Sequence, residues 1–282
     1  MILVFGQTGQ VAQEIAGLSQ DVVLLGRAVC DVAEAGAARA AILEQRPTFV
    51  VNAAAYTAVD KAETEPDLAA KINSAAPGEM AAACAELGIP LVHISTDYVF
   101  DGGGVSPFLP TDPTNPRNAY GRSKLAGEGG VRVAGGAFAI LRTSWVFSAH
   151  GSNFVKTMLR LSETRSHLTV VADQIGGPTP AADIASACVT IAERLEEDPT
   201  LSGAYHFSGA PDVNWADFAR EIFRQAGRNV TVEDIPSSAY PTPAERPKNS
   251  RLNCDSLSVF GLERPDWREG LSKVLHELGA LK

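Results

Sequence analysis

Tyr120 and Lys124 are the pair of side chains in this sequence best suited to acid–base chemistry. On a helix, residues four apart share a face, so the phenol and the ammonium group can point to one site. A free tyrosine has a pKa of about 10 and carries protons poorly at neutral pH. A positive charge about 4–5 Å away stabilises the phenolate by roughly 3–4 kcal/mol, which lowers this pKa by about two to three. We therefore expect Lys124 to bring the pKa of Tyr120 near the operating pH.

A second polar group follows the apolar segment Leu91–Ser95, which is typical of a strand buried in a sheet. Thr96 and Asp97 come directly after it. Ligands of open α/β sheets bind at the carboxyl ends of the strands, so both side chains are candidates for a site. The Thr96 hydroxyl could donate a hydrogen bond to a carbonyl oxygen that gains negative charge. The alternative is a turn in which these side chains only cap the backbone.

A glycine-bearing turn with the pattern GxxGxxA follows the first apolar segment, 2–5. Gly6 permits a tight turn, Gly9 lets the backbone approach a pyrophosphate, and Ala12 lets the next helix pack closely. The start of that helix offers unpaired N–H groups to an anion. The turn, between a strand and a helix, predicts dinucleotide binding.

The choice between two nicotinamide cofactors depends on the end of the second strand. A site for NAD usually has a carboxylate there for the ribose hydroxyls, whereas this chain has Gly26 and Arg27. Arg27 could pair with the 2′-phosphate of NADPH through its fork of donors, although a solvated surface arginine is the alternative. We therefore predict NADPH as the cofactor. Because the Asp31 carboxylate lies nearby, we leave NADH open.

Apolar and polar segments alternate in a way that predicts a doubly wound, Rossmann-type parallel sheet with a smaller α/β lobe. We expect an NADP(H)-binding domain at 1–150 and a mainly substrate-binding lobe at 151–282, with parts of about 165–200 returning to the first domain. Strands are expected at 2–5, 22–25, 48–51, 91–95, 138–142, 169–172 and 204–207. Helices are expected at 11–19, 35–45, 66–87, 120–128, 153–162, 183–195 and 215–226, and an extended loop at 236–247.

Composition excludes several classes of protein. The 282 residues include 24 Lys and Arg against 33 Asp and Glu, a net charge of −9 that disfavours nucleic-acid binding. No segment approaches the roughly 18 apolar residues of a membrane span, and no signal peptide is evident. The four cysteines are scattered and without metal-ligand spacing, so we expect reduced core residues in a cytoplasmic protein. His93, inside an apolar segment, is expected to be buried and satisfied.

Along essentially its full length the chain resembles the dTDP-4-dehydrorhamnose reductases, which are extended short-chain dehydrogenases/reductases of nucleotide-sugar metabolism. The matching stretches are FGQTGQVA (5–12), VNAAAYTAVDKAE (51–63), HISTDYVFDG (93–102), NAYGRSKLAGE (118–128), LRTSWVF (141–147), DQIGGPT (173–179) and YPTPAERPKNSRLN (240–253). The last three lie outside the general reductase signature and therefore indicate this particular family.

The resemblance implies roles for individual residues. Cofactor contacts would come from Gly6, Gly9, Gln10, Val11, Arg27, Asp31, Val32, Ala53, Ala54 and Ala55, with Tyr120 and Lys124 at the nicotinamide ribose. Substrate contacts would come from Thr96, Asp97 and Trp145, whose flat ring suits a deoxysugar. Arg246, Asn249 and Ser250 would suit a diphosphate or thymine, and a structural role for them is nearly as well supported.

The implied reaction is the NADPH-dependent reduction of the C4 ketone of dTDP-4-dehydro-6-deoxy-L-mannose to dTDP-L-rhamnose, a precursor of cell-surface polysaccharide. Tyr120 would protonate the new alkoxide, with Thr96 and Lys124 assisting. Another nucleotide-sugar epimerase or reductase, or a non-catalytic NADP-binding regulatory subunit, remain as alternatives. Glu14 resembles a residue that helps some members hold Mg²⁺ at a dimer interface. The glutamate expected near Ala182 is absent, so Mg²⁺ is possible but is not predicted, and a homodimer is left open.

Overall fold

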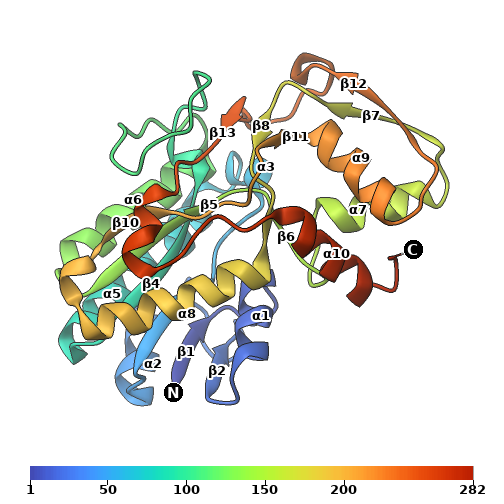
Figure 1. Ribbon diagram of the computed structural model, residues 1–282. Helices are drawn as coiled ribbons and strands as arrows, with labels where there is room; N and C mark the ends of the chain where they lie inside the picture. Colours follow the sequence, from blue (N-terminus) through green and yellow to red (C-terminus); the bar gives the residue numbers. More distant parts are fainter. Residues whose placement is uncertain (282) are drawn as a thin grey trace.

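Six short segments, mostly apolar, form one parallel sheet at the centre of the computed structural model, which describes residues 1–281 (Figure 1). The strands are β1 (Ile2–Phe5), β2 (Val22–Leu25), β3 (Phe49–Asn52), β4 (Leu91–Thr96), β5 (Phe138–Thr143) and β10 (Gly203–His206). Their order is β10-β5-β4-β3-β1-β2, and every neighbouring pair is parallel. The predicted doubly wound sheet is confirmed. The strand order reverses between β1 and β3, where such sheets bind ligands.

Helices cover both faces of this sheet and bury separate apolar clusters against it. On one face α1 (Gln10–Leu18) lies against α8 (Ala181–Glu197), and their apolar residues share a cluster with β1, β3, β4 and β5. On the other face α2 (Ala37–Gln45), α5 (Ala76–Leu87) and α6 (Ala119–Ala134) pack side by side. This arrangement sets the N-terminal ends of α1 and α6 at the edge of the sheet where the strands end.

The long helix expected at 66–87 is interrupted. The structure has α4 (Pro66–Ala70), a π-helical turn at Lys71–Ala75, and then α5, and a short unpredicted helix, α3 (Val59–Ala62), precedes them. Asn73, in the π-helical turn, is fully buried. Its side chain accepts from the Tyr56 amide at 2.8 Å and donates to the Tyr56 carbonyl at 3.0 Å and to Ser123 Oγ at 3.0 Å. These bonds satisfy a buried amide and tie the turn to α6.

The remaining elements form a lobe with its own apolar cluster. It contains α7 (Phe154–Ser162), β7 (His167–Val171), α9 (Trp215–Gln225), β12 (Thr231–Ile235) and α10 (Trp267–Glu277). The segment 165–200 was expected to return in part to the first domain. Within it, β7 pairs with β12 of the lobe, whereas α8 packs on the central sheet. Small strands join the lobe to the sheet: β6 (Val146–Phe147) pairs with β9 (Thr179–Pro180), and β8 (Ile175–Gly176) with β11 (Val213–Asn214) and β13 (Asn249–Ser250). Helix α10, β12 and the two-residue strands were not predicted.

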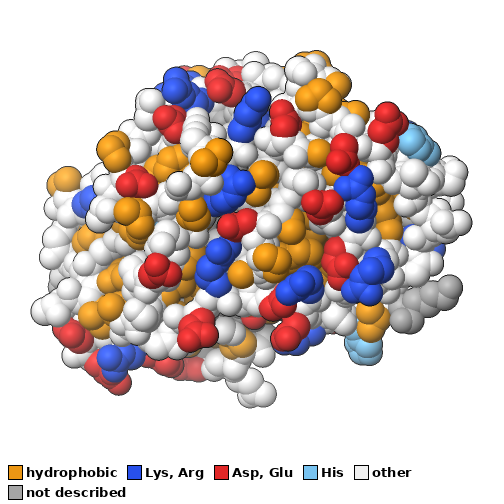
Figure 2. Space-filling view, turned by 45° about the horizontal axis from the view of Figure 1, so that its top comes forward, with side chains coloured by type: hydrophobic (Ala, Val, Ile, Leu, Met, Phe, Trp, Pro, Cys, Tyr) orange, Lys and Arg blue, Asp and Glu red, His pale blue; other side chains and the backbone are white. Residues whose placement is uncertain are grey.

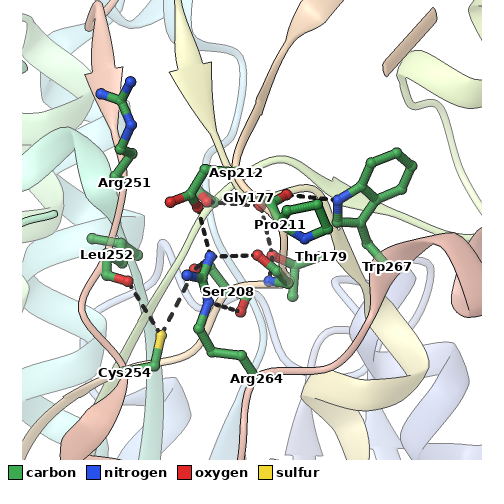
Figure 3. Close-up of polar contacts among 12 residues, drawn as sticks. Gly177, Thr179, Ser208, Pro211, Asp212, Arg251, Leu252, Cys254, Arg264 and Trp267 are labelled. Carbon is green, nitrogen blue, oxygen red and sulfur yellow. Dashed lines mark hydrogen bonds and ion pairs between the residues drawn. The ribbon is translucent and has the colours of Figure 1, made fainter. Parts of the chain in front are cut away.

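Arg264 anchors the segment that connects β10 to the lobe. Its guanidinium donates to the carbonyls of Ser208 (3.1 Å) and Gly209 (2.5 Å) and pairs with Asp212 at 2.6 Å (Figure 3). Beside it, Trp267 Nε1 donates to the Pro211 carbonyl at 2.8 Å. These bonds satisfy the polar groups of a connection that lies against the fully buried core of the lobe.

Helix α6 is held to the sheet by a buried ion pair. Arg142 on β5 donates from Nε to Glu128 Oε1 at 2.8 Å and from Nη2 to Oε2 at 2.6 Å, and Ser95 Oγ on β4 donates to Oε1 at 2.7 Å. Arg142 is 2% exposed and Glu128 is fully buried. Bidentate geometry and a third donor are what a buried ion pair needs to offset its desolvation. The pair therefore fixes the face of α6 that also carries Lys124 and Tyr120.

Charges on the surface are mixed in sign. Figure 2 shows acidic and basic side chains interspersed over one face, which gives that face no broad positive surface. Within residues 1–281, no helix has both the length and the apolarity to cross a membrane.

Removing one partner of the buried pair should destabilise the fold strongly. Glu128→Leu leaves the Arg142 charge buried and unpaired, so we expect a loss of about 3–5 kcal/mol in the free energy of unfolding. Arg132 also lies near Glu128, at 3.4 Å, but is 42% exposed, so Arg132→Ala should cost less than about 1 kcal/mol. The double variant Glu128→Leu/Arg142→Met should recover part of the loss. Urea unfolding measures all three, and equal stability of Glu128→Leu and Arg132→Ala would contradict this account.

Candidate active site

A cavity of about 1250 Å³ lies at the carboxyl edge of the sheet, between the sheet and the lobe. It receives residues from the glycine turn, the ends of β3, β4 and β5, the start of α6, and the loop before β13. Its lining includes these predicted site residues: Gly9, Gln10, Val11, Ala53, Ala54, Ala55, Thr96, Asp97, Tyr120, Lys124, Trp145, Arg246 and Ser250. Gly6, Arg27, Asp31, Val32 and Asn249 are not among the lining residues.

The glycine turn has the geometry that a phosphate cradle needs. Gly6 has φ +107°, and a Cβ there would lie 3.3 Å from the Ala53 carbonyl group, so the close approach requires glycine. Helix α1 starts after Gly9 without a side-chain cap. The first amide groups of α1 are therefore available to an anion at the cavity.

Gln10 contributes its backbone rather than its side chain to this cradle. Its Oε1 accepts from Ser148 Oγ at 3.0 Å and from Asn153 Nδ2 at 2.8 Å, while Nε2 donates to the Val146 carbonyl at 3.4 Å. The amide thus ties α1 to the segment before α7. The main chain of Gln10 is left for a cofactor.

The residues that could choose between cofactors lie past the end of β2. Arg27 is exposed, and its side chain makes no hydrogen bond or ion pair with any residue in 1–281. Asp31 Oδ1 accepts from the Ala33 amide at 3.0 Å, so one oxygen of that carboxylate caps a turn. Within the described chain Arg27 is therefore free of protein partners and stays a candidate for contact with a 2′-phosphate, although it does not line the cavity.

Tyr120 sits in the first turn of α6, whose start is firmly held. The Asn118 side chain accepts from the Gly121 amide at 2.8 Å, and Glu63 Oε1 accepts from the Ala119 amide at 2.7 Å. The Tyr98 ring packs edge-on against the Tyr120 ring at 5.5 Å. These contacts leave the phenol little freedom to turn away from the cavity.

The pKa of Tyr120 moves opposite to the expectation from sequence. Loss of water raises it to about 12, the Asp97 charge adds to the rise, and the Thr96 hydroxyl opposes it. The prediction that Lys124 lowers this pKa is wrong for the protein without cofactor, because burial dominates. At neutral pH the phenol therefore holds its proton, which suits a proton donor.

Lys124 is 2% exposed and points its ammonium along β4. Nζ donates to the Ile94 carbonyl at 2.7 Å and lies 3.5 Å from His93 Nε2. Burial lowers the pKa of Lys124 to about 8, and Glu128 partly offsets the fall. His93 is buried, lies 3.0 Å through Nδ1 from Asn52 Nδ2, and has a pKa held well below its usual range by burial and Lys124. The predicted buried, satisfied histidine is confirmed.

Thr96 and Asp97 both face the cavity, and Thr96 also caps the backbone. Thr96 Oγ1 donates to Asp97 Oδ1 at 3.1 Å and accepts from the Tyr98 amide at 3.2 Å, so the capping alternative holds in part. Burial raises the pKa of Asp97 to about 6. Among the described residues, Thr143 Oγ1 is buried without a hydrogen-bond partner, and Asp97 Oδ2 and Ser250 Oγ, which lie near each other, form no hydrogen bond of good geometry. Because such atoms are costly to leave unpaired, they indicate a polar ligand in this part of the cavity.

Arg246 and Asn249, for which the resemblance implies substrate contacts, differ in whether their side-chain donors are already used by the protein. Arg246 Nη2 pairs with Asp60 at 2.7 Å, while its buried Nη1 has no partner in the described chain. Asn249 Nδ2 donates to the carbonyls of Gly103 (3.1 Å) and Ser106 (2.8 Å), so its amide is occupied in holding a loop. For Asn249 the structural alternative fits and the substrate role does not.

Trp145 is half-buried and stacks on a residue that sequence reasoning missed. The rings of Trp145 and Trp215 lie 3.6 Å apart at 11°. Trp215 reads in the sequence only as the start of an amphipathic helix, and no motif marks it. One face of Trp145 is therefore covered by protein, and a sugar can contact only what remains of the ring.

Glu14 does not complete a metal site. Its Oε1 lies 3.8 Å from His150 Nε2, and burial together with the charges of Glu277 and Asp183 raises its pKa. Over residues 1–281, no group of three or more His, Cys, Asp or Glu side chains is arranged to hold a metal ion.

The phosphate cradle at the strand reversal and the Tyr–Lys pair beside it define an NAD(P)H-dependent oxidoreductase of the extended short-chain class. Residues 1–280 match the family described as RmlD substrate binding domain, and the chain belongs to this family. It is 44% identical to a dTDP-4-dehydrorhamnose reductase of Sinorhizobium fredii, over 98% of this chain and 97% of the relative. The predicted resemblance is thereby confirmed.

Solved structures agree. A dTDP-4-dehydrorhamnose reductase of Clostridium acetobutylicum superposes with a TM-score of 0.91 at 37% identity, covering 99% of each chain. One from Bacillus anthracis, solved in complex with NADP, gives 0.91 at 36% identity over 98% of each chain. The NADP in that relative supports the predicted cofactor.

Arg27 should govern the choice of cofactor. Replacing it by alanine removes a charge-assisted contact with the 2′-phosphate, so the ratio of kcat/KM for NADPH to that for NADH should fall about tenfold or more. Arg228, which is also exposed but lies in the lobe, provides the control Arg228→Ala with an unchanged ratio. The measurement is NADPH and NADH oxidation at low salt, and an unchanged ratio in Arg27→Ala would exclude the role.

Proposed function

We propose that the protein catalyses the NADPH-dependent reduction of the C4 ketone of dTDP-4-dehydro-6-deoxy-L-mannose to dTDP-L-rhamnose. The observation that carries the proposal is the presence of Thr96, Tyr120 and Lys124 beside the glycine turn in one cavity. The names of the relatives, at 44% and 37% identity over nearly the whole chain, support the substrate.

Each residue of the site has a separate role in the reaction, which follows from its charge and its hydrogen-bonding groups. NADPH, when bound, supplies the hydride that the ketone carbon accepts. Lys124 binds the ribose hydroxyls, because its ammonium has donors beyond the one used on Ile94. Tyr120, protonated at neutral pH, gives its proton to the C4 oxygen as that oxygen becomes an alkoxide, and water later restores the phenol. Thr96 donates to the same oxygen once its hydroxyl turns away from Asp97 Oδ1.

The unpaired polar atoms of the cavity suit the rest of the substrate. Asp97 Oδ2 and Ser250 Oγ can receive and donate hydrogen bonds with sugar hydroxyls, and Arg246 Nη1 can donate to a diphosphate oxygen. We infer that the sheet binds the cofactor and the lobe binds the nucleotide sugar. A cytoplasmic site for the reaction is supported by four cysteines that are all buried and free. A homodimer stays a prediction.

Loss of the phenolic hydroxyl should stop the chemistry and spare cofactor binding. For Tyr120→Phe we expect kcat to fall about 10²- to 10⁴-fold, while the Kd for NADPH changes by less than about twofold. Tyr205, whose hydroxyl donates to the Leu201 carbonyl away from the cavity, provides the control Tyr205→Phe with normal turnover. NADPH oxidation and fluorescence titration measure the two quantities, and near-normal turnover in Tyr120→Phe would falsify the assignment.

Asp97 should impose an acid limit on substrate capture. Its pKa is raised to about 6, so the carboxylate that binds hydroxyl groups is present above pH 6 and lost as the pH falls through that value. We expect kcat/KM for the nucleotide sugar to decline below about pH 6 in the wild type.

Two variants test whether the Asp97 carboxyl group, and not another titrating group, causes the decline of kcat/KM at low pH. Asp97→Asn should have a lower kcat/KM that no longer depends on pH between about 5 and 7. Asp67→Asn, on exposed α4, should keep the wild-type profile. An acid limb that persists unchanged in Asp97→Asn would assign it to another group.

A further inference from the structure

Two indole rings from different parts of the fold meet at the cavity. Trp145 follows β5 of the sheet, and Trp215 begins α9 of the lobe. Their centroids lie 3.6 Å apart at an interplanar angle of 11°. Aromatic pairs usually have centroids 4.5–7 Å apart, so this pair is closely stacked. Both rings line the cavity that holds Tyr120.

Trp215 is fixed from several sides. Its Nε1 donates to Gln174 Oε1 at 3.2 Å, and Gln174 Nε2 in turn donates to Ser237 Oγ at 3.0 Å. The Phe154 ring packs on it at 4.7 Å. The Asn214 side chain caps α9 directly beside it. A ring with this many anchors is a rigid support for whatever stacks on it.

Trp145, in contrast, has a backbone that needs support. Its φ is +47°, a left-handed conformation that a bulky residue adopts only where the surroundings hold it. The Thr179 amide donates to its carbonyl at 3.2 Å. On β8, a Cβ on Gly176 would lie 3.0 Å from Trp145 Cε2, so only glycine leaves room for the ring. Trp145 is thus held by its stack on Trp215 and lies close to Gly176.

We propose that Trp215 is a positioning residue for the reduction, which holds Trp145 against the sugar end of the cavity through their stacked rings and its hydrogen bond to Gln174. This inference rests on the proposed function, because it takes Trp145 as a contact of the nucleotide sugar. Strain at a site residue is maintained by the structure around it, and Trp215 supplies that structure from the lobe. The contact also explains how the lobe takes part in the reaction without bringing an acid or a base.

Steady-state kinetics with dTDP-4-dehydro-6-deoxy-L-mannose and NADPH test the proposal. Trp215→Leu removes the stack and the N–H, so KM for the sugar nucleotide should rise about tenfold while KM for NADPH stays within about twofold. Trp215→Phe keeps a ring, and Gln174→Met keeps the stack without its anchor, so both should show a smaller rise of about threefold.

Trp267 provides the matched control. It is a buried tryptophan in the core of the same lobe, and its Nε1 donates to the Pro211 carbonyl. Trp267→Phe should lower the Tm and leave both KM values unchanged. A purely structural role for Trp215 would give the same pattern in Trp215→Leu, with a lower Tm and an unchanged KM for the sugar nucleotide, and that pattern would overturn the proposal.

Circular dichroism provides a readout without substrate. Closely stacked indoles couple their electronic transitions and give an exciton couplet, which should be present in the wild type and Trp267→Phe and absent in Trp215→Leu. Absence of the couplet in the wild type would overturn the inference. A wild type that shows the couplet but does not turn over the sugar nucleotide would instead refute the proposed function, and with it the role of Trp215 in the reduction.

Discussion

The buried contact among Glu128, Arg142 and Ser95 is the constraint on which the site depends. It joins α6 to both β4 and β5, so it fixes the rotation of the helix about its own axis. Lys124 and Tyr120 lie one and two turns before Glu128 on the same face. Neither charge of the pair can turn toward water, because both are sealed in the protein. A rotation or shift of α6 would therefore leave a buried charge unpaired, which is strongly destabilising.

Burial also decides the protonation states of the site. It raises the pKa of Tyr120 and Asp97 and lowers the pKa of Lys124, in each case by disfavouring the charged form. A phenol with a high pKa stays protonated at neutral pH and so has a proton to give, and an alkoxide is basic enough to take it.

Much of the fold could be predicted from sequence because its signals are local. Continuous apolar segments such as Ile2–Phe5 mark buried parallel strands, and the glycine turn after it marks the cofactor cradle. The break in the helix at Lys71–Ala75 was missed although Pro77 signals it, because a proline cannot donate to the carbonyl four residues earlier and its ring crowds that carbonyl. The hydrogen bond of the Asn73 side chain to Tyr56, 17 residues earlier, could not be predicted from local signals. The helix at Trp267–Glu277 was missed as well.

The features of the site likewise fall into those that local sequence predicts and those that depend on tertiary contacts. Spacing alone predicts that Tyr120 and Lys124 share a face, whereas the pKa of Tyr120 depends on how much water the fold removes. The role of Asn249 and the stack of Trp145 on Trp215 likewise depend on tertiary contacts.

A crystal structure with NADP⁺ and dTDP-L-rhamnose tests the central claim most directly. We predict Tyr120 Oη within about 3 Å of the sugar C4 oxygen and Lys124 Nζ on the nicotinamide ribose. A C4 oxygen out of reach of Tyr120 would contradict the account.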